Sequence, residues 1–181
     1  LESQVAQRTA ELGRVNVLLG NVMQAATEVA IIATDRDGVI TLFNRGAERM
    51  LGYRAEETIG RQTPARFHLE SEVSARAAEL HREYQEVIEG FRVFVHKPAL
   101  TGSEAREWTY VRKDGSHFPV VLVVTSMRNE AGDLIGFLGI ATDITDQRKQ
   151  SAELMGARDR LLMAADIAEL GIWTWTAADN S

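Results

Sequence analysis

The sequence predicts an α+β domain, in which strands joined by tight turns alternate with helices. Short apolar segments end in sequences that favour hairpins, among them Asp35 to Gly38, Asp114-Gly115 and Ala131-Gly132. Apolar residues from Leu69 to Ile88 instead recur at helical spacing, which predicts one long amphipathic helix. Apolar segments joined by hairpin turns, together with a helical pattern in one chain of this size, predict a sheet with helices packed on it.

The composition is that of a globular chain rather than a disordered one. The 181 residues are 45% apolar and 25% charged, which suits one domain with flanking helices. The net charge is −6, so we expect no nucleic-acid partner. No apolar segment approaches the ~18 residues of a membrane span, so we expect a cytoplasmic location and no membrane contact in this stretch, although a longer protein could be anchored upstream.

The chain lacks the residue patterns of common catalytic and metal sites. Cysteine is absent, which excludes disulfides, thiolate metal sites and cysteine nucleophiles. The four histidines are 13, 15 and 21 positions apart, so no pair has helical zinc-ligand spacing, and we interpret each as a surface or satisfied histidine. There is no Walker loop, serine nucleophile elbow or dinucleotide glycine motif, and we expect no enzyme and no metal.

The first segment, to about Gln24, predicts a helix with a coiled-coil stripe. Its apolar residues follow four-three spacing, with Arg8 interrupting and Gly13 and Gly20 weakening an isolated helix. We expect this helix to pair with a second copy; the alternative is a helix docked on its own domain. The expected dimer contacts are Leu1, Val5, Leu12, Val15, Leu19 and Val22.

The rest of the chain is assigned from turns, caps and periodicity. Asn44 and Gly52 bracket a short helix, a second lies near Ala55 to Thr58, and Pro64 begins another turn. The predicted strands are Val29 to Thr34, Val39 to Phe43, Phe91 to Lys97, Glu107 to Arg112, His117 to Met127 and Leu134 to Thr142.

Two of these strands contain runs that are apolar without alternation, Val120 to Val124 and Leu134 to Ala141. In a sheet with one solvent-exposed face, apolar and polar residues should alternate along each strand. We therefore expect both faces at the centre of this sheet to be covered. The core under the long helix would cover one face. The amino-terminal helix or a partner subunit would cover the other.

The chain contains five short sequence motifs in this order: D-R-D-G, V-I-T-L-F-N, A-E-R-M-L-G-Y, R-K-D-G-S-H-F-P and G-F-L-G-I-A-T-D-I-T. Together they resemble the PAS family of bacterial multidomain signalling proteins, such as sensor histidine kinases of two-component systems and diguanylate cyclases. The resemblance implies a five-stranded antiparallel sheet with short helices and one long helix on one face, flanked by coiled-coil-like helices. It divides the chain into a linker helix (1–28), a PAS domain (29–145), a second linker helix (146–168) and the truncated start of another PAS domain (169–181).

The resemblance also implies a sensory role, with a small ligand or cofactor in a pocket and a signal relayed through the flanking helices to a covalently linked output domain. The alternative is a dimerisation and relay module without ligand. Expected pocket residues are Asn44, Met50, Phe67, Phe91, Trp108, Tyr110, Leu122, Val124, Phe137 and Gly139.

The cofactor choice stays open on sequence. Cysteine-based flavin photochemistry is excluded, and the helix position of a haem ligand, near Ala75 to Ala78, holds no histidine. A non-covalent flavin (FAD), a small acid or amide, or an empty pocket are the alternatives.

The end of the PAS-like stretch predicts a signalling junction. Asp143-Ile144-Thr145 resembles the motif that ends PAS domains, where strand pairing stops and a helix begins. Asp143 or Thr145 would cap that helix, and Asp143 could pair with Arg112 or Lys113 on a neighbouring strand end.

Overall fold

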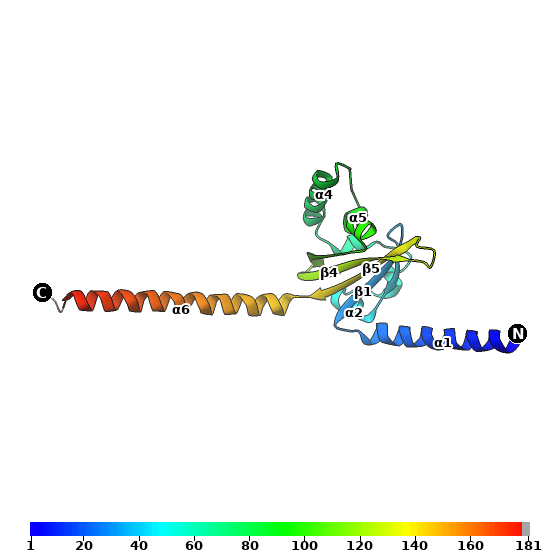
Figure 1. The fold of residues 1–181 in the computed structure, drawn as a ribbon, viewed down its shortest axis with the longest axis horizontal. Helices are drawn as coiled ribbons and strands as arrows, with labels where there is room; N and C mark the ends of the chain where they lie inside the picture. Colours follow the sequence, from blue (N-terminus) through cyan, green and yellow to red (C-terminus); the bar gives the residue numbers. More distant parts are fainter. Residues whose placement is uncertain (179–181) are drawn as a thin grey trace. The chain divides into compact units, whose positions relative to one another are not determined.

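The structure is a computed structural model that describes residues 1–178, with side chains described as far as Glu169. It divides into two units, one from Leu1 to Asp143 and one that begins at Ile144 (Figure 1). The elements in chain order are α1 (Glu2–Ala25), β1 (Val29–Asp35), β2 (Ile40–Phe43), α2 (Arg45–Leu51), α3 (Ala55–Thr58), the 3-10 helix η1 (Pro64–Phe67), α4 (Glu70–Tyr84), α5 (Arg92–Thr101), β3 (Ser103–Val111), β4 (His117–Arg128), β5 (Leu134–Asp143) and α6 (Thr145–Ala178).

The five strands form one antiparallel sheet in the order β2-β1-β5-β4-β3. The first and last strands in the chain, β1 and β5, therefore lie side by side near its centre, with Ile32 opposite Gly139. The α+β class and the five-stranded antiparallel sheet are as predicted. Their physical basis is local, since short turns join β1 to β2, β3 to β4 and β4 to β5.

Burial along β4 alternates although its sequence does not. Val120, Leu122 and Val124 are buried on the inner face, whereas Val123 is 37% exposed on the other face. Ile140, opposite Val123 in β5, is 36% exposed. The chain itself therefore leaves the outer face of the sheet partly open.

The amino-terminal helix does not cover this face. No residue of α1 is buried, and its apolar side chains, including Leu12 and Val15, are exposed. The helix reaches the domain beside α2 (Figure 1). The expectation that α1 of the same chain shields the outer sheet face is wrong; cover by a partner subunit stays a prediction.

The segment predicted as a strand from Phe91 to Lys97 is a helix, α5. Its Val-Phe-Val sequence favours a strand by propensity, but Val93, Phe94, Val95 and Pro98 are buried on the helix instead. Phe91, Phe94, Val95 and Pro98 have the spacing i, i+3, i+4, i+7, which is a helical face. Burial of this face outweighed local propensity.

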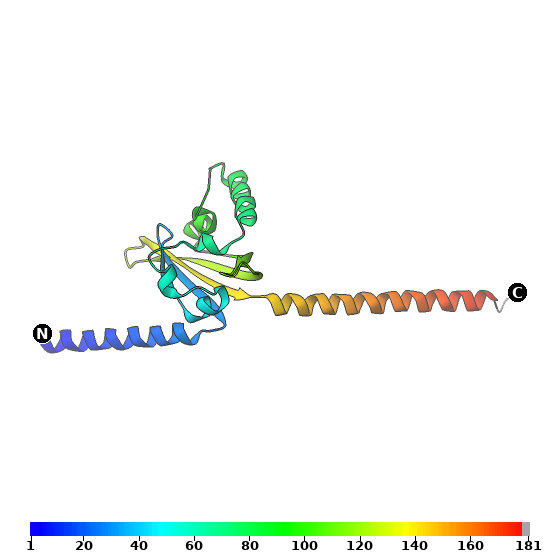
Figure 2. The same ribbon diagram turned by 180° about the vertical axis from the view of Figure 1, so that it is seen from behind.

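The long helix is shorter than predicted and takes a different place. α4 ends at Tyr84, because Gln85 adopts a left-handed conformation with φ 56°. It is α5 that packs on β3 and β4, and α4 lies against α5 (Figures 1 and 2). The expectation that the long helix itself lies on the sheet is therefore replaced by a two-helix arrangement.

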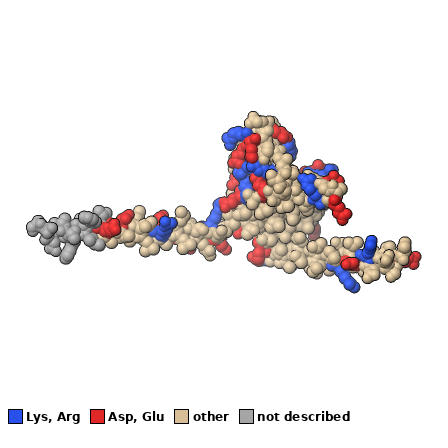
Figure 3. Space-filling view, viewed as in Figure 1, with Lys and Arg blue, Asp and Glu red and all other residues tan. Residues whose placement is uncertain are grey.

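Ion pairs link α4 to the edge strand β3. Arg76 is buried, and its guanidinium lies 3.0 Å from Glu79 and 2.5 Å from Glu104. Arg106 also pairs with Glu79, at 3.0 Å. Figure 3 shows acidic and basic side chains interleaved at this end of the domain. Alternating charges of this kind hold a helix that has little apolar contact with the sheet.

The last helix is continuous from Thr145 to Ala178. The segment predicted to begin a second PAS domain, 169–181, is helical as far as residue 178, and its last three residues lie outside the described part of the chain. That domain assignment stays a prediction.

Candidate functional site

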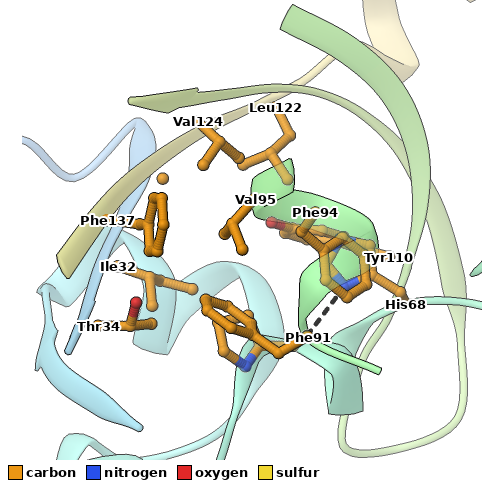
Figure 4. Close-up of a pocket in the computed structure, with 12 residues that line it drawn as sticks. Ile32, Thr34, His68, Phe91, Phe94, Val95, Tyr110, Leu122, Val124 and Phe137 are labelled. Atoms are coloured by element: carbon orange, nitrogen blue, oxygen red, sulfur yellow. Dashed lines mark hydrogen bonds between the residues drawn. The ribbon is translucent and has the colours of Figure 1, made fainter. Parts of the chain in front are cut away.

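A cavity of about 30 Å³ lies between the inner face of the sheet and α5. Side chains from β1, β3, β4, β5, η1 and α5 converge on it (Figure 4). The lining residues are Ile32, Thr34, Pro64, His68, Phe91, Phe94, Val95, Tyr110, Leu122, Val124, Phe137 and Gly139.

Two residues of this lining each have a buried side-chain atom with no hydrogen-bond partner in the described residues: Thr34 at Oγ1 and His68 at Nε2. Thr34 is 4% exposed and His68 is 6% exposed, so water outside the domain does not satisfy them. Buried polar atoms normally have a partner, and one that lacks it calls for an explanation. A cavity with two such residues in its wall is a candidate binding site.

The imidazole of His68 is held rigidly by its neighbours. Its ring centroid lies 4.2 Å from that of Phe94, 4.9 Å from Tyr110 and 5.1 Å from Trp108. Nδ1 lies 2.9 Å from the carbonyl oxygen of Pro64 (Figure 4). A carbonyl can only accept, so Nδ1 must carry the proton of this bond.

Burial lowers the pKa of His68 from 6.5 to about 4, although the Pro64 hydrogen bond and the Glu72 charge act in the opposite direction. The ring is therefore neutral near pH 7. With its proton on Nδ1, the ring presents a bare lone pair at Nε2. His68 is thus a hydrogen-bond acceptor at the cavity wall.

The turn between β1 and β2 packs closely against Phe91, one of the lining residues. A Cβ at Gly38 would lie 2.5 Å from the ring of Phe91, and Gly38 has φ 89°. Only glycine accommodates both the contact and the backbone. Phe91 in turn meets Phe137 edge-on, at 5.9 Å between centroids.

The predicted pocket residues fall into two groups. Phe91, Tyr110, Leu122, Val124, Phe137 and Gly139 line the cavity. Asn44, Met50, Phe67 and Trp108 do not: Phe67 is core between Phe43 and Tyr53, Trp108 stands behind His68, and Met50 is partly buried. The long helix α4 contributes no lining residue, whereas α5 contributes Phe94 and Val95.

The sequence interpretation missed six lining residues: Ile32, Thr34, Pro64, His68, Phe94 and Val95. Phe94 and Val95 carry a signal, since they share a helical face with Phe91. Ile32 and Thr34 follow Ala30 at a spacing of two along β1, which places all three on one face of the strand. His68 carries no such signal, because a single histidine before a helix is indistinguishable from a surface residue.

Asn44 serves as a structural link rather than a pocket wall. Its Oδ1 accepts hydrogen bonds from the backbone N–H groups of Ile31 and Ala47, at 2.9 and 2.8 Å. Its Nδ2 lies 2.9 to 3.2 Å from three carbonyl oxygens, those of Met23, Ala26 and Val29. One buried amide therefore ties the end of α1 and the start of β1 to the first turn of α2.

At the predicted junction, Asp143 ends β5 and its carboxylate lies 3.8 Å from the guanidinium of Arg112. Arg112 also stacks over Phe118, at 3.8 Å from the ring centroid. Lys113 pairs with Glu57 instead, at 2.5 Å. Of the two cations considered, Arg112 is the partner of Asp143. Ile144 precedes α6, whose first residue is Thr145.

Two absences bear on the chemistry of the described residues. Within them, no group of three or more His, Asp or Glu side chains could hold a metal ion. None of their helices is both long and apolar enough to cross a membrane.

A family model described as the PAS fold matches residues 19–144. The chain belongs to the PAS family. The match includes every strand of the sheet and every residue of the cavity wall.

A curated relative is the sensor protein FixL of Bradyrhizobium diazoefficiens, which is 27% identical over 143 residues. The match covers 78% of this chain but only 26% of FixL, so the chain spans about a quarter of that relative's length. The chain is therefore similar to one part of a sensor protein.

Solved structures agree with the fold. A PAS domain from Colwellia psychrerythraea is 24% identical, with a TM-score of 0.54 over 73% of this chain and 98% of that one. An RNA-binding light-oxygen-voltage receptor is 22% identical, with a TM-score of 0.60 over 80% of this chain and 38% of that one. At these identities the likeness concerns the fold alone.

Proposed function

We propose that this PAS domain is the non-catalytic input module of a signalling protein, which binds a small ligand in the cavity beside His68 and relays occupancy through its flanking helices. The observation that carries the proposal is the pair of buried, unbonded polar atoms in the cavity wall, on Thr34 and His68. Each such atom costs roughly 1–3 kcal/mol when left without a partner. A ligand that satisfies both would recover that free energy.

The cavity argues against a large cofactor. Pockets for drug-sized ligands and cofactors span roughly 300–1,000 Å³, whereas this one is about 30 Å³. FAD does not fit the residues present. Haem would need a histidine ligand on α4, and the expected place, near Ala75 to Ala78, holds none. We therefore propose an organic ligand of few atoms.

Two strands connect the cavity to the helices. β1 carries Ile32 and Thr34 in the cavity wall and is bonded through Asn44 to the end of α1. β5 carries Phe137 and Gly139 in the wall and ends at Asp143. A ligand that shifts either strand would displace the hydrogen bonds of Asn44 or the ion pair of Asp143 with Arg112. Both flanking helices would thus receive the signal.

The proposed assembly is a homodimer linked to an output domain. Contact with a second copy is favoured by exposed apolar residues in two places, along α1 and on the outer sheet face at Val123 and Ile140. The similarity to one part of a sensor protein supports a covalently linked output domain. As part of the proposal, that output is a histidine kinase or diguanylate cyclase in a cytoplasmic protein of the two-component type.

A second candidate function is a dimerisation and relay module without ligand. The small volume of the cavity favours it, because about 30 Å³ leaves room for only about two water molecules. In that case the polar atoms of Thr34 and His68 would be bridged by trapped water.

Native mass spectrometry of freshly purified protein, followed by melting measurements with a metabolite library, distinguishes a ligand-binding sensor from a relay module without ligand. A sensor carries a ligand or melts at higher temperature with one, because binding to the folded state alone stabilises it by about 2.7 kcal/mol at a hundred times Kd. A dimer that carries nothing and responds to no compound would support the relay module instead.

A further inference from the structure

The chemistry of the cavity wall restricts the class of ligand, and this inference rests on the sensory function proposed above. Nε2 of His68 is an acceptor, because the proton of the neutral ring is used in the bond to Pro64. A ligand group that faces it must therefore donate. A carboxylate, ketone or nitrile offers only lone pairs and would leave Nε2 unsatisfied.

The same cavity wall also disfavours a charged ligand. None of its twelve lining residues, all within the described part of the chain, is Lys, Arg, Asp or Glu. The nearby carboxylate of Glu72 is occupied by the backbone N–H and the hydroxyl of Thr109, at 2.7 and 2.8 Å. An ion in the cavity would lose its hydration without gaining a counter-ion, which is among the costliest transfers in a protein.

The size of the ligand follows from the volume. A water needs about 10–15 Å³ of such space, so the cavity of about 30 Å³ holds about two water-sized groups. A molecule of two or three non-hydrogen atoms fits without rearrangement. A larger one requires Phe91, Phe94 or Val95, the three lining residues at or in α5, to move.

We propose that the cavity selects small uncharged molecules that carry an O–H or N–H donor, the class of short alcohols and primary amides. His68 accepts the hydrogen bond of the donor, and the hydroxyl of Thr34 makes the second polar contact. Anions and donor-free molecules of equal size are rejected.

Three probes of equal size test this selectivity: formamide, which donates; acetonitrile, which is neutral but only accepts; and formate, which is an anion. Each is titrated into the protein labelled with ¹⁵N in its histidines and backbone. We expect formamide to shift the Nε2 resonance of His68 and the amide of Gly139 saturably in the millimolar range, as befits so few atoms. Acetonitrile and formate leave both resonances in place.

Two variants locate the contacts. Thr34→Val removes a hydroxyl without changing shape, and we expect formamide to bind roughly 2- to 10-fold more weakly. His68→Phe should abolish the saturable response at Gly139. His96→Phe is the matched control: His96 also has a buried Nε2 without a partner in the described residues, but it does not line the cavity, so the formamide response should persist.

The inference is overturned if formate or acetonitrile shifts the His68 resonance as strongly as formamide does, or if Thr34→Val binds formamide like the parent protein. Absence of any saturable shift with formamide also overturns it. These outcomes differ from failure of the sensory function. An anionic or apolar ligand that co-purifies would refute this selectivity but support sensing, whereas selective formamide binding in a protein whose output ignores every ligand would refute sensing alone.

Discussion

The side-chain amide of Asn44 donates a 2.9 Å hydrogen bond to the carbonyl of Ala26, the C-cap residue that follows α1. The oxygen of the same amide caps α2 by accepting from Ala47. The carbonyl of Val29 also lies so close to α2 that a Cβ at Gly46 would be 2.0 Å from it. The entry of the chain into the domain is therefore fixed by one side chain and one glycine.

We predict that Asn44→Asp destabilises the domain by about 2–4 kcal/mol. The carboxylate keeps the two acceptor contacts but replaces the donor, and it faces the carbonyls of Met23, Ala26 and Val29 in a buried place. Urea unfolding measures the free energy. Asn21→Asp, at an exposed position of α1, is the control and should cost less than 1 kcal/mol. Equal stability of the two variants would mean that the Asn44 bonds are dispensable.

The second prediction concerns acid stability and depends on His68. In the unfolded chain its pKa returns to about 6.5, whereas burial holds it near 4 in the folded domain. Below pH 6.5 the unfolded state binds a proton that the folded state does not, so acid favours unfolding. The contribution of the neutral ring to the free energy of unfolding is fully present above pH 6.5. The free energy of unfolding then decreases by about 3 kcal/mol as the pH falls to 4.

The measurement is urea unfolding of the parent protein and of His68→Phe from pH 7.5 to 4. Carboxylates titrate in part of this range in both proteins, so the difference between the two isolates the histidine. That difference should change by about 3 kcal/mol in favour of the variant as the pH falls. A difference that is constant with pH would show that His68 has the same pKa in the folded and unfolded states, so that its ring reaches solvent in the folded domain.

The elements that could be predicted from the sequence are those set by local signals. The Asn44 and Gly52 caps defined α2 to the residue, and the turn at Asp35 to Gly38 located β1 and β2. α5 was missed because its Val-Phe-Val run favours a strand locally, and its helical face is stabilised only by contact with the sheet.

The cavity was predictable to the extent that strands alternate. Leu122 and Val124 on β4, and Phe137 on β5, face inward by their period of two. His68 was not predictable, because its burial depends on α5 and β3 closing over it from distant parts of the chain. A residue whose role arises from tertiary contacts alone leaves no local pattern.

The third prediction is a dimer formed by the outer sheet face and α1. Ile140→Glu places a charge on the exposed apolar face, and we expect it to convert a dimer to monomer in light scattering. Val87→Glu is the matched control, since Val87 is also exposed and apolar but lies outside the sheet. Removal of Leu1 to Met23 should weaken the dimer and lower solubility. If parent protein and truncated domain are both soluble monomers, the apolar stripe of α1 has no role in self-association.

The fourth prediction concerns the exit of the signal at Asp143. Its ion pair with Arg112 spans 3.8 Å, and both side chains are about one-third exposed, so the pair contributes at most about 1 kcal/mol. Strain from an occupied cavity can break an ion pair this weak, and a conformational switch requires an interaction that a ligand can break. We therefore expect Asp143→Ala to leave the domain folded, with unfolding free energy changed by less than about 1 kcal/mol.

In an intact protein that includes the output domain, Asp143→Ala should remove the response of the output to the ligand while basal output persists. Glu57→Ala is the matched control, because it breaks the surface pair with Lys113 on the neighbouring turn but leaves the end of β5 unchanged. The control should keep the response. If Asp143→Ala keeps it as well, the ion pair is only structural, and the signal must leave through β1, Asn44 and the end of α1.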